Sequence, residues 1–416
     1  MARLPDPMSS SFAELSSGVV LAAIVVLTAV ATTSCAEPLP SAPSAPPVVL
    51  PLPTVAQDVW ASRGHVLVRE PFDPPLDDPD SVLGESRRAV YTSVSGVDGS
   101  IRQVSGAFFI PRGTPPPNGW PVISLAHAAT GIDNGCGPST EPDLKGYLSA
   151  VRSLVAQRYA VALSDYEGLG PTGSHPFLEP RTAAFNIIDA VRALREIFPT
   201  VSPRWVAFGN SQGGQAAWAA NELNSYYGDG LELLGSAALS PGANITGVAN
   251  LAWAGSMTNE QESLYPLVIA GLERYNVDLD ERAFLRGRAA ADMGVLADCR
   301  SPVSDPGSKS TAADLKPDTL KDVARLREAL QKIALPQRQL DKPMLVVNGM
   351  RDETVLPAWV DSAVADSCRL GGVIEHVEIP DAGHTDLAPE ADNTVQSWLS
   401  YRFAGLAPPS NCEASP

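Results

Sequence analysis

The residues Gly209-Asn210-Ser211-Gln212-Gly213 form a G-x-S-x-G pattern between an apolar run and an alanine-rich, helix-prone segment. In a strand–turn–helix context this spacing places a serine on a sharp turn, where its hydroxyl can act as a nucleophile. The glycines let strand and helix approach closely, and the backbone N–H of Gln212 faces the position where an oxyanion would develop. The pattern also arises by chance in glycine-rich loops, so it predicts catalysis only together with a base and an acid.

A serine nucleophile needs a base, and the chain has five histidines. On a parallel α/β sheet of this type the catalytic order is serine, acid, histidine. His376 and His384 are the histidines that follow Ser211. His376 lies in an alternating run typical of a half-buried strand, whereas His384 lies in a polar loop just after that run. We therefore predict His384 as the general base.

The acid that orients the base is also expected just after a strand. Asp352 follows the apolar run 343–349 at a turn. Asp381 is the alternative, but it is close to His384 in the same loop and is expected to shape that loop. We predict Asp352 as the acid; its structural alternative is a turn or helix-cap aspartate.

A second oxyanion donor is expected from the loop after an earlier strand. The segment LAHAATG, residues 125–131, has this position, and its small residues would bring backbone N–H groups close to a substrate. Ala129 and Thr130 are the candidates beside Gln212. His127 in the same loop is expected to brace the turn rather than to act as the base.

A competing motif is G-x-G-x-x-G, which residues 168–173 match. A dinucleotide site requires this motif to open a helix whose N-terminus faces the pyrophosphate. Here Pro171 and the segment SHPFLEP delay the next helix to about Arg181, and Asp189 lies inside that helix. We therefore predict no dinucleotide cofactor. The sequence has no H-E-x-x-H, Walker A or EF-hand pattern, so no metal is predicted either.

The elements that must position these residues alternate between short apolar strands and amphipathic helices. A hairpin is predicted around a turn at residues 97–99. Nearly continuous apolar strands between helices predict a mostly parallel sheet of about eight strands, with helices on both faces. The interval of about 243–336 breaks this alternation and is predicted to be a helical cap over the carboxyl ends of the strands, within one α/β domain over residues 56–412. The predicted strands lie near residues 121–128, 159–166, 204–209, 233–240, 343–349 and 373–380.

The composition limits the classes of partner. The chain has 416 residues, 44% of them hydrophobic and 19% charged, which is enough to bury a large core. Its net charge is −17, and such a surface repels phosphate backbones and anionic lipid headgroups. Nucleic acid is therefore not expected as a partner.

The N-terminus has the features of an export signal. Residues 19–31 form an apolar run that fits the core of a signal peptide over residues 1–34, and retention as a short membrane anchor is the alternative. Small residues precede Cys35, as in bacterial lipoprotein processing sites, so lipidation of Cys35 and simple cleavage are both open. Either route predicts a secreted or envelope-attached protein. Residues 35–55 are rich in proline and predict an extended tether.

The cysteine count agrees with an oxidising compartment. Cys35 apart, the chain has an even four, which predicts two disulfides in one of three connectivities. No pair has C-x-x-C spacing, so a thiolate metal site is not expected. The four are Cys136, Cys299, Cys368 and Cys412.

Five segments together resemble the secretory lipases, an α/β-hydrolase family that includes fungal lipase A-type enzymes and exported actinobacterial relatives. They are HAATGIDNGCGPS, SDYEGLGPTGSHPF, GNSQGG, NGMRDETVLP and DAGHTD, and the likeness runs from about residue 60 to 412. Its most specific part is DYEGLGPTGSHP. One departure is that many relatives have HGTTG where this chain has HAATG at residues 127–131, so Ala128 replaces a glycine.

The resemblance carries several expectations. It implies acyl-ester hydrolysis without metal or cofactor, with Ser211 as nucleophile, Asp352 as acid and His384 as base. It implies that the helical cap forms the acyl-chain pocket. It also implies one disulfide between Cys136 and Cys299, which leaves Cys368 and Cys412 for the second.

We therefore expect an exported serine hydrolase of the carboxylic-ester class, a lipase or esterase whose partner is an acyl-ester or lipid substrate. A serine peptidase or another acyl transferase on the same fold is one alternative, although little sequence precedes the first strand to build a gating domain. A non-catalytic envelope protein that binds lipid under the cap is the other, and an intact triad speaks against it. A lipidated Cys35 or a retained apolar segment would attach the protein to a membrane.

Overall fold

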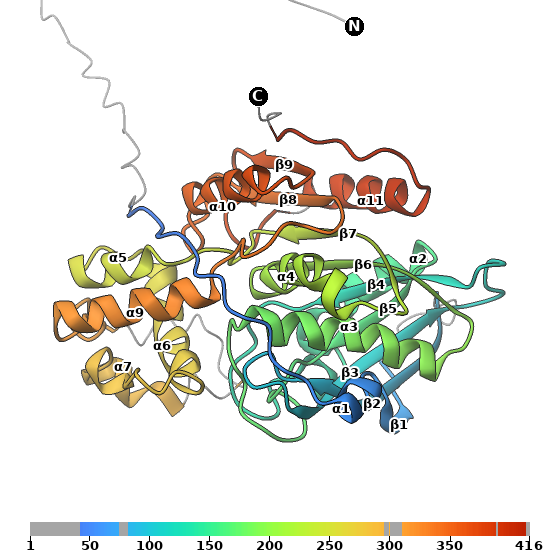
Figure 1. Ribbon diagram of the computed structural model, residues 1–416, viewed down its shortest axis with the longest axis horizontal. Coiled ribbons are helices and arrows are strands. Elements are labelled where there is room, and N and C mark those ends of the chain that lie inside the picture. Colours follow the sequence, from blue (N-terminus) through green and yellow to red (C-terminus); the bar gives the residue numbers. More distant parts are fainter. Residues whose placement is uncertain (1–41, 75–81, 295–298, 300–309, 388–389, 413–416) are drawn as a thin grey trace, which may run out of the picture. The chain divides into compact units, whose positions relative to one another are not determined.

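The apolar strand segments pair into one nine-stranded sheet in the computed structural model (Figure 1). The structure describes residues 42–74, 82–294, 299, 310–387 and 390–412. Residues 39–416 belong to one compact unit, which contains every element described below. The strands are β1 (Val66–Pro71), β2 (Leu83–Val94), β3 (Ile101–Pro111), β4 (Trp120–Ala126), β5 (Ala160–Ser164), β6 (Val201–Asn210), β7 (Glu232–Leu239), β8 (Met344–Gly349) and β9 (Ile374–Ile379).

The sheet is parallel over most of its width. Its strand order is β1-β2-β3-β5-β4-β6-β7-β8-β9. The hairpin prediction is confirmed, because β2 and β3 pair antiparallel up to Val94 and Ile101 at the turn. From β5 to β9 all neighbouring strands are parallel. The mostly parallel sheet was predicted; β1 at the antiparallel edge was not.

Helices cover both faces of the sheet because its buried strands are apolar on both sides. In β4, Val122 packs into the core shared with α3 (Pro180–Ile197) and α4 (Gln212–Tyr227), whereas its neighbour Ile123 packs into the core shared with α2 (Leu148–Ala156) and α11 (Glu390–Phe403). This alternation is the two-residue period of a strand. The helices are α1 (Gln57–Ala61), α2 (Leu148–Ala156), α3 (Pro180–Ile197), α4 (Gln212–Tyr227), α5 (Val248–Ala254), α6 (Asn259–Glu273), α7 (Gly287–Ala291), α9 (Leu320–Ile333), α10 (Pro357–Arg369) and α11 (Glu390–Phe403).

The helices α5, α6, α7 and α9 lie between β7 and β8 in the chain and gather beside one end of the sheet in Figure 1 (yellow to orange). They occupy the interval in which the sequence predicted a cap. Helix α6 begins with a capping box, in which Thr258 and Gln261 satisfy each other's backbone N–H groups. This capping box fixes the residue at which α6 begins.

Residues 42–55, the N-terminal strap, are not a tether. The strap crosses the face shown in Figure 1 (blue) and is hydrogen-bonded along its length. Trp359 Nε1 donates to the Ala42 carbonyl at 2.8 Å, Val48 N–H donates to Gln331 at 2.8 Å, and Arg338 donates to the Leu50 carbonyl at 2.7 Å. An extended proline-rich backbone makes no hydrogen bonds of its own, so its polar groups are available to the cap and the body. The prediction of a tether is therefore wrong for these residues.

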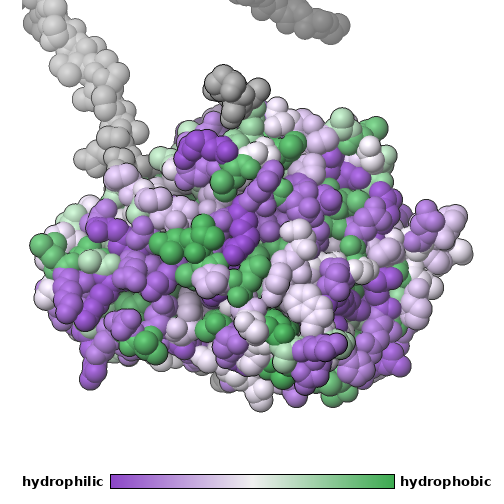
Figure 2. Space-filling view, in the orientation of Figure 1, coloured by the Kyte–Doolittle hydropathy of each residue, from purple (hydrophilic) through white to green (hydrophobic). Residues whose placement is uncertain are grey.

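The strap also covers part of the cap. Asn244 is buried, and its Nδ2 donates to the Ala45 carbonyl at 2.9 Å. The strap leaves the side chains of Val48 and Val49 39% and 61% exposed. Hydrophobic side chains gather near the middle of the face in Figure 2, beside the path that the strap takes in Figure 1.

The predicted signal segment 1–34 and Cys35 lie outside the described residues. Among the residues that the structure does describe, no helix combines the length and the apolar composition needed to cross a membrane.

The four cysteines that the structure describes form two pairs, and the two side chains within each pair are neighbours. Cys368 and Cys412 form a disulfide with their Cα atoms 5.5 Å apart. Burial raises the pKa of the Cys136 thiol to about 12, with a hydrogen bond to Cys299 as the next cause. The two thiols are therefore neighbours, and a Cys136–Cys299 disulfide stays a prediction.

Candidate active site

Ser211 lies on the turn that joins β6 to α4. Its φ is 56°, in the left-handed region that a residue with a side chain adopts only under strain. The surrounding structure holds it there, since Ser211 N–H donates to the Leu239 carbonyl at 2.9 Å and Gln215 N–H donates to the Ser211 carbonyl at 3.0 Å. The hydroxyl is thereby displayed at the carboxyl end of the sheet.

The two glycines of the pattern are required by close packing. A Cβ atom on Gly213 would lie 2.0 Å from the Ala126 carbonyl oxygen of β4. A Cβ on Gly209 would lie 2.5 Å from the backbone of Gly213. Neither distance is sterically tolerable, so the two glycines of G-x-S-x-G are required because α4 lies so close to β4 and β6.

Ser211, His384 and Asp352 form one hydrogen-bonded chain. His384 Nε2 lies 2.9 Å from Ser211 Oγ, and His384 Nδ1 lies 2.7 Å from Asp352 Oδ2. The Asp352 side chain is fully buried, and that of His384 is 9% exposed. Such a chain allows the imidazole to take the serine proton while the carboxylate holds its tautomer.

The loops after β8 and β9 bring the acid and the histidine together. Asp352 Oδ1 accepts the backbone N–H groups of Thr354 at 2.9 Å and Val355 at 2.8 Å, which fixes the carboxylate. Asp381, the alternative acid, is exposed and pairs with Arg351. His376 lies within β9, with Nε2 2.6 Å from Asn348 Oδ1. Within the described part of the chain, neither Asp381 nor His376 is hydrogen-bonded to Ser211 or His384.

The candidate oxyanion donors flank Ser211. Gln212 begins α4, and the first N–H groups of a helix have no intrahelical partner. In the opposite loop the Ala128 N–H is already used, because it donates to Tyr147 Oη at 2.6 Å. Ala129 is the next residue and lines the cavity at Ser211. The Thr130 hydroxyl is buried without a hydrogen-bond partner among the described residues.

Tyr147 is a site residue that sequence reasoning missed. Its hydroxyl accepts from Ala128 N–H and donates to Asn210 Oδ1 at 3.1 Å, so it connects the HAATG loop to the residue before Ser211. No spacing in the sequence relates Tyr147 to either partner, because the contact arises from tertiary packing alone.

An apolar cavity of about 70 Å³ opens at Ser211. Helix α6 of the cap supplies Gln261, Leu264, Tyr265 and Val268 to its wall, and α10 supplies Trp359. The remaining lining residues are Ala129, Phe177, Leu178, Gln212, Gly242, Ile245, Val248, Thr354 and Val355. The cap therefore forms one side of the space in which a group bound to Ser211 would lie.

The start of α6 is fastened to the loop that carries Asp352. Thr258 Oγ1 donates to the Glu353 carbonyl at 2.6 Å, and Gln261 Nε2 donates to the Thr354 carbonyl at 3.3 Å. Thr354 Oγ1 also hydrogen-bonds Glu260. These contacts hold α6 against the cavity in the state described.

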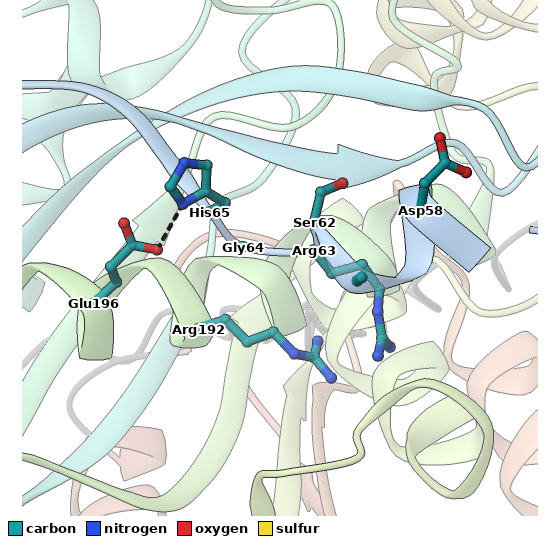
Figure 3. A pocket seen from close by; sticks show the side chains of 8 residues that line it. Asp58, Ser62, Arg63, Gly64, His65, Arg192 and Glu196 are labelled. Atoms are coloured by element: carbon teal, nitrogen blue, oxygen red, sulfur yellow. Dashed lines mark hydrogen bonds and ion pairs between the residues drawn. The ribbon is translucent and has the colours of Figure 1, made fainter. Parts of the chain in front are cut away.

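A larger cavity, of about 410 Å³, lies between α1 and α3 (Figure 3). It contains a serine and a histidine, but they do not form a catalytic pair. Ser62 Oγ donates to the Val59 carbonyl at 2.9 Å, and His65 Nδ1 contacts Glu196 Oε2 at 3.2 Å. Arg63 and Arg192 are both engaged with Asp229. The larger volume of this cavity therefore does not identify it as a catalytic site.

In the described ranges, no group of three or more histidine, cysteine, aspartate or glutamate side chains is arranged to hold a metal ion.

The secretory lipase family model matches residues 147–411. The chain belongs to the secretory lipase family. The matched part of this secretory lipase includes Ser211, Asp352, His384 and the cap helices, whereas the HAATG loop precedes it. Family membership makes the chain a carboxylic-ester hydrolase of the lipase and esterase class.

Solved structures show the same fold. Lipase A from Candida antarctica is 18% identical, covers 88% of this secretory lipase and 90% of its own chain, and has a TM-score of 0.67. The rice cell wall degrading esterase LipA from Xanthomonas oryzae is 21% identical, with coverages of 82% and 96% and a TM-score of 0.63. A hydrolase from Legionella pneumophila described as putative is 17% identical, with coverages of 84% and 100% and a TM-score of 0.60. The α/β-hydrolase prediction is thereby confirmed. No curated protein sequence matches the chain.

Acid is expected to destabilise this secretory lipase through His175, a fully buried residue beside Gln212. Burial lowers the pKa of His175 from 6.5 to about 3. Between these two pH values the unfolded chain binds a proton that the folded protein does not bind, so the free energy of unfolding rises with pH in that window. The slope from this residue is at most about 1.4 kcal/mol per pH unit.

The measurement is the free energy of unfolding in urea at pH 7 and pH 5, for the wild type and for His175→Phe. The wild type is expected to lose more stability than the variant between the two pH values, because phenylalanine does not titrate. Equal losses in both proteins would contradict the assignment of a neutral, buried His175.

Proposed function

We propose that this secretory lipase hydrolyses acyl esters through an acyl-enzyme intermediate on Ser211. The observation that carries the proposal is the hydrogen-bonded chain from Ser211 Oγ to His384 at 2.9 Å and from His384 to Asp352 at 2.7 Å. Each neighbouring atom pair is within the range expected for a nucleophile, its base and the orienting acid.

In the first half of the reaction, Ser211 Oγ attacks the ester carbonyl carbon and its proton passes to His384 Nε2. The tetrahedral intermediate collapses, the carbon–oxygen bond to the alcohol breaks, and His384 returns the proton to the leaving alcohol. In the second half, His384 takes a proton from water, the resulting hydroxide attacks the acyl carbon, and Ser211 leaves with the proton. Asp352 stays ionised and stabilises the imidazolium in both halves.

The negative charge on the carbonyl oxygen would be stabilised by backbone N–H groups on the two sides of Ser211. Gln212 supplies one, because it begins α4 and its N–H has no intrahelical partner. Ala129 is the favoured second donor, since it lines the cavity and the preceding N–H is taken by Tyr147. Thr130 is the remaining candidate. Losing one such donor costs on the order of 10²–10³ in kcat.

The size of the cavity favours short acyl chains in the state described. At about 70 Å³ the cavity is well below the roughly 150 Å³ that accommodates one benzene molecule in an engineered protein core. A short acyl group is therefore expected to fit beneath α6 as it stands. A long acyl chain would require α6 to move away from the loop of Asp352.

The test is a series of p-nitrophenyl esters with acyl chains of increasing length, each measured below and above its solubility limit, beside a peptide p-nitroanilide. Saturable turnover of short esters below the limit is expected, and longer esters should turn over faster once an interface is present. Cleavage of the anilide without ester turnover would contradict the proposal and support the peptidase alternative. Binding of lipid without any turnover would support the non-catalytic alternative.

We also propose that the protein is exported, which rests on the apolar run 19–31 and on membership of a secretory family. Mass spectrometry of the mature N-terminus tests this. A chain that begins at a lipid-modified Cys35 would indicate attachment to the envelope, and an unmodified shortened chain would indicate secretion. A full-length chain found in the cytoplasm would contradict export.

A further inference from the structure

The segment 165–175, which contains most of the family-specific DYEGLGPTGSHP motif, takes no part in the proposed proton transfers. It connects β5 to α3 and lies beside Ser211, since Phe177 and Leu178, just after it, line the catalytic cavity. Its side chains are therefore placed to act on the residues that surround the nucleophile.

His175 contacts Gln212, the residue that follows the nucleophile. His175 Nδ1 lies 2.7 Å from the Glu167 carbonyl oxygen, and His175 Nε2 lies 3.1 Å from Gln212 Nε2. A carbonyl only accepts, so Nδ1 carries the proton. The neutral ring then presents a lone pair at Nε2, which accepts an N–H of the Gln212 amide. Because His175 is only 2% exposed, bulk solvent does not compete with Gln212 for Nε2.

Tyr166, another residue of the motif, contacts the HAATG loop on the other side of Ser211. Its hydroxyl donates to the His127 carbonyl at 3.0 Å, at the start of the HAATG loop. The Tyr166 ring also packs on the ring of His127, with 4.3 Å between centroids, and stacks on His175 at 6.1 Å with an interplanar angle of 17°. One stack of three rings thus joins the HAATG loop to Gln212.

The segment is itself held rigidly. Asp165 is buried, and its Oδ1 accepts Ser139 N–H at 2.7 Å while its Oδ2 accepts the hydroxyls of Ser105 and Ser139. Gly168 has a φ of +80°, and a Cβ atom there would lie 2.2 Å from His175 N. The glycine therefore lets the segment fold back closely enough to deliver His175 to Gln212.

We propose that His175 is a positioning residue of the oxyanion hole, which fixes the Gln212 side chain and thereby the direction of the Gln212 backbone N–H. Tyr166 does the same for the HAATG loop through the His127 carbonyl. This role rests on the proposed function, because positioning the Gln212 N–H affects catalysis only if that N–H stabilises an oxyanion. The peptide between Ser211 and Gln212 follows a strained residue, so an anchored side chain restricts the rotation that would relieve the strain.

The experiment is a double-mutant cycle with His175→Phe and Gln212→Met, measured on p-nitrophenyl butyrate. His175→Phe removes the acceptor but keeps a ring in the stack, and Gln212→Met removes the donor but keeps the backbone N–H. Each variant is expected to lower kcat by about 10- to 100-fold with KM within about twofold, since the hydrogen bond positions an N–H group that stabilises the transition state. The double variant should be no slower than the slower single variant, because both changes remove the same contact.

His376→Phe serves as the matched control, since it also replaces a histidine, whose side chain is 14% exposed, and is expected to change kcat by less than about twofold. If His175→Phe does not fold, Gln212→Met alone keeps the test, because it leaves the ring stack intact. Three results would overturn the inference: kcat values within twofold of the wild type, an effect confined to KM, or losses that multiply in the double variant. Failure of the proposed function is separate, because it would appear as full activity in Ser211→Ala.

Discussion

Replacement of Ser211 by alanine is expected to lower kcat on a short-chain ester by about six orders of magnitude. The variant lacks the atom that attacks the carbonyl carbon. Some catalysis above the uncatalysed rate should remain, because the oxyanion donors and the binding cavity persist. The stability of the protein should change little, since alanine at a φ of 56° is strained to the same degree as serine.

The measurement is kcat for p-nitrophenyl butyrate on purified protein, with the thermal midpoint as a check of folding. Ser62→Ala is the matched control, because Ser62 lies beside a histidine in the larger cavity but donates to a carbonyl instead of to that histidine. It is expected to retain wild-type activity within about twofold. Activity that survives in Ser211→Ala and is lost in Ser62→Ala would indicate that the reaction takes place in the cavity between α1 and α3.

Replacement of Asp352 by asparagine is expected to lower kcat by about four orders of magnitude. The hydrogen bonds around the carboxylate explain the size of the effect. Oδ1 accepts two backbone N–H groups, so the single oxygen of asparagine must remain there. The amide nitrogen then faces His384 Nδ1 and donates to it. That tautomer carries its proton on Nε2, which cannot accept the proton of Ser211.

The same assay measures this effect, and Asp381→Asn is its control. Asp381 is an aspartate in the loop of His384, but it is exposed and pairs with Arg351. Surface ion pairs contribute little, so activity within about twofold of the wild type is expected. Equal losses in both variants would indicate a general effect of loop charge and would contradict the role of Asp352 in fixing the tautomer.

The parts of the candidate site that could be predicted are those with local sequence signals. Ser211 is marked by two glycines at positions where a side chain would collide with the backbone. Asp352 and His384 follow strands whose apolar runs are evident, and parallel strands bring their carboxyl ends to one edge. The regular alternation of apolar strands and helices made the mostly parallel sheet predictable.

The unpredicted parts depend on contacts between distant segments. The proline-rich composition of residues 42–55 indicated a tether, yet the hydrogen-bond partners that fix this strap lie in the cap, in α10 and at Arg338. Strand β1 is largely exposed, so it lacks the apolar run that identifies buried strands. Tyr147 and His175 act through partners far along the chain, and no spacing in the sequence relates them to Ser211.

The most direct test of a Ser211-centred mechanism is covalent labelling with a fluorophosphonate, followed by peptide mass spectrometry. A displayed, His384-activated hydroxyl is expected to displace fluoride and form a stable phosphonyl ester. One adduct is expected, on the peptide that contains Ser211, and none is expected in Ser211→Ala. An active enzyme that remains unlabelled, or an adduct on another serine that forms equally well in Ser211→Ala, would contradict the Ser211-centred mechanism.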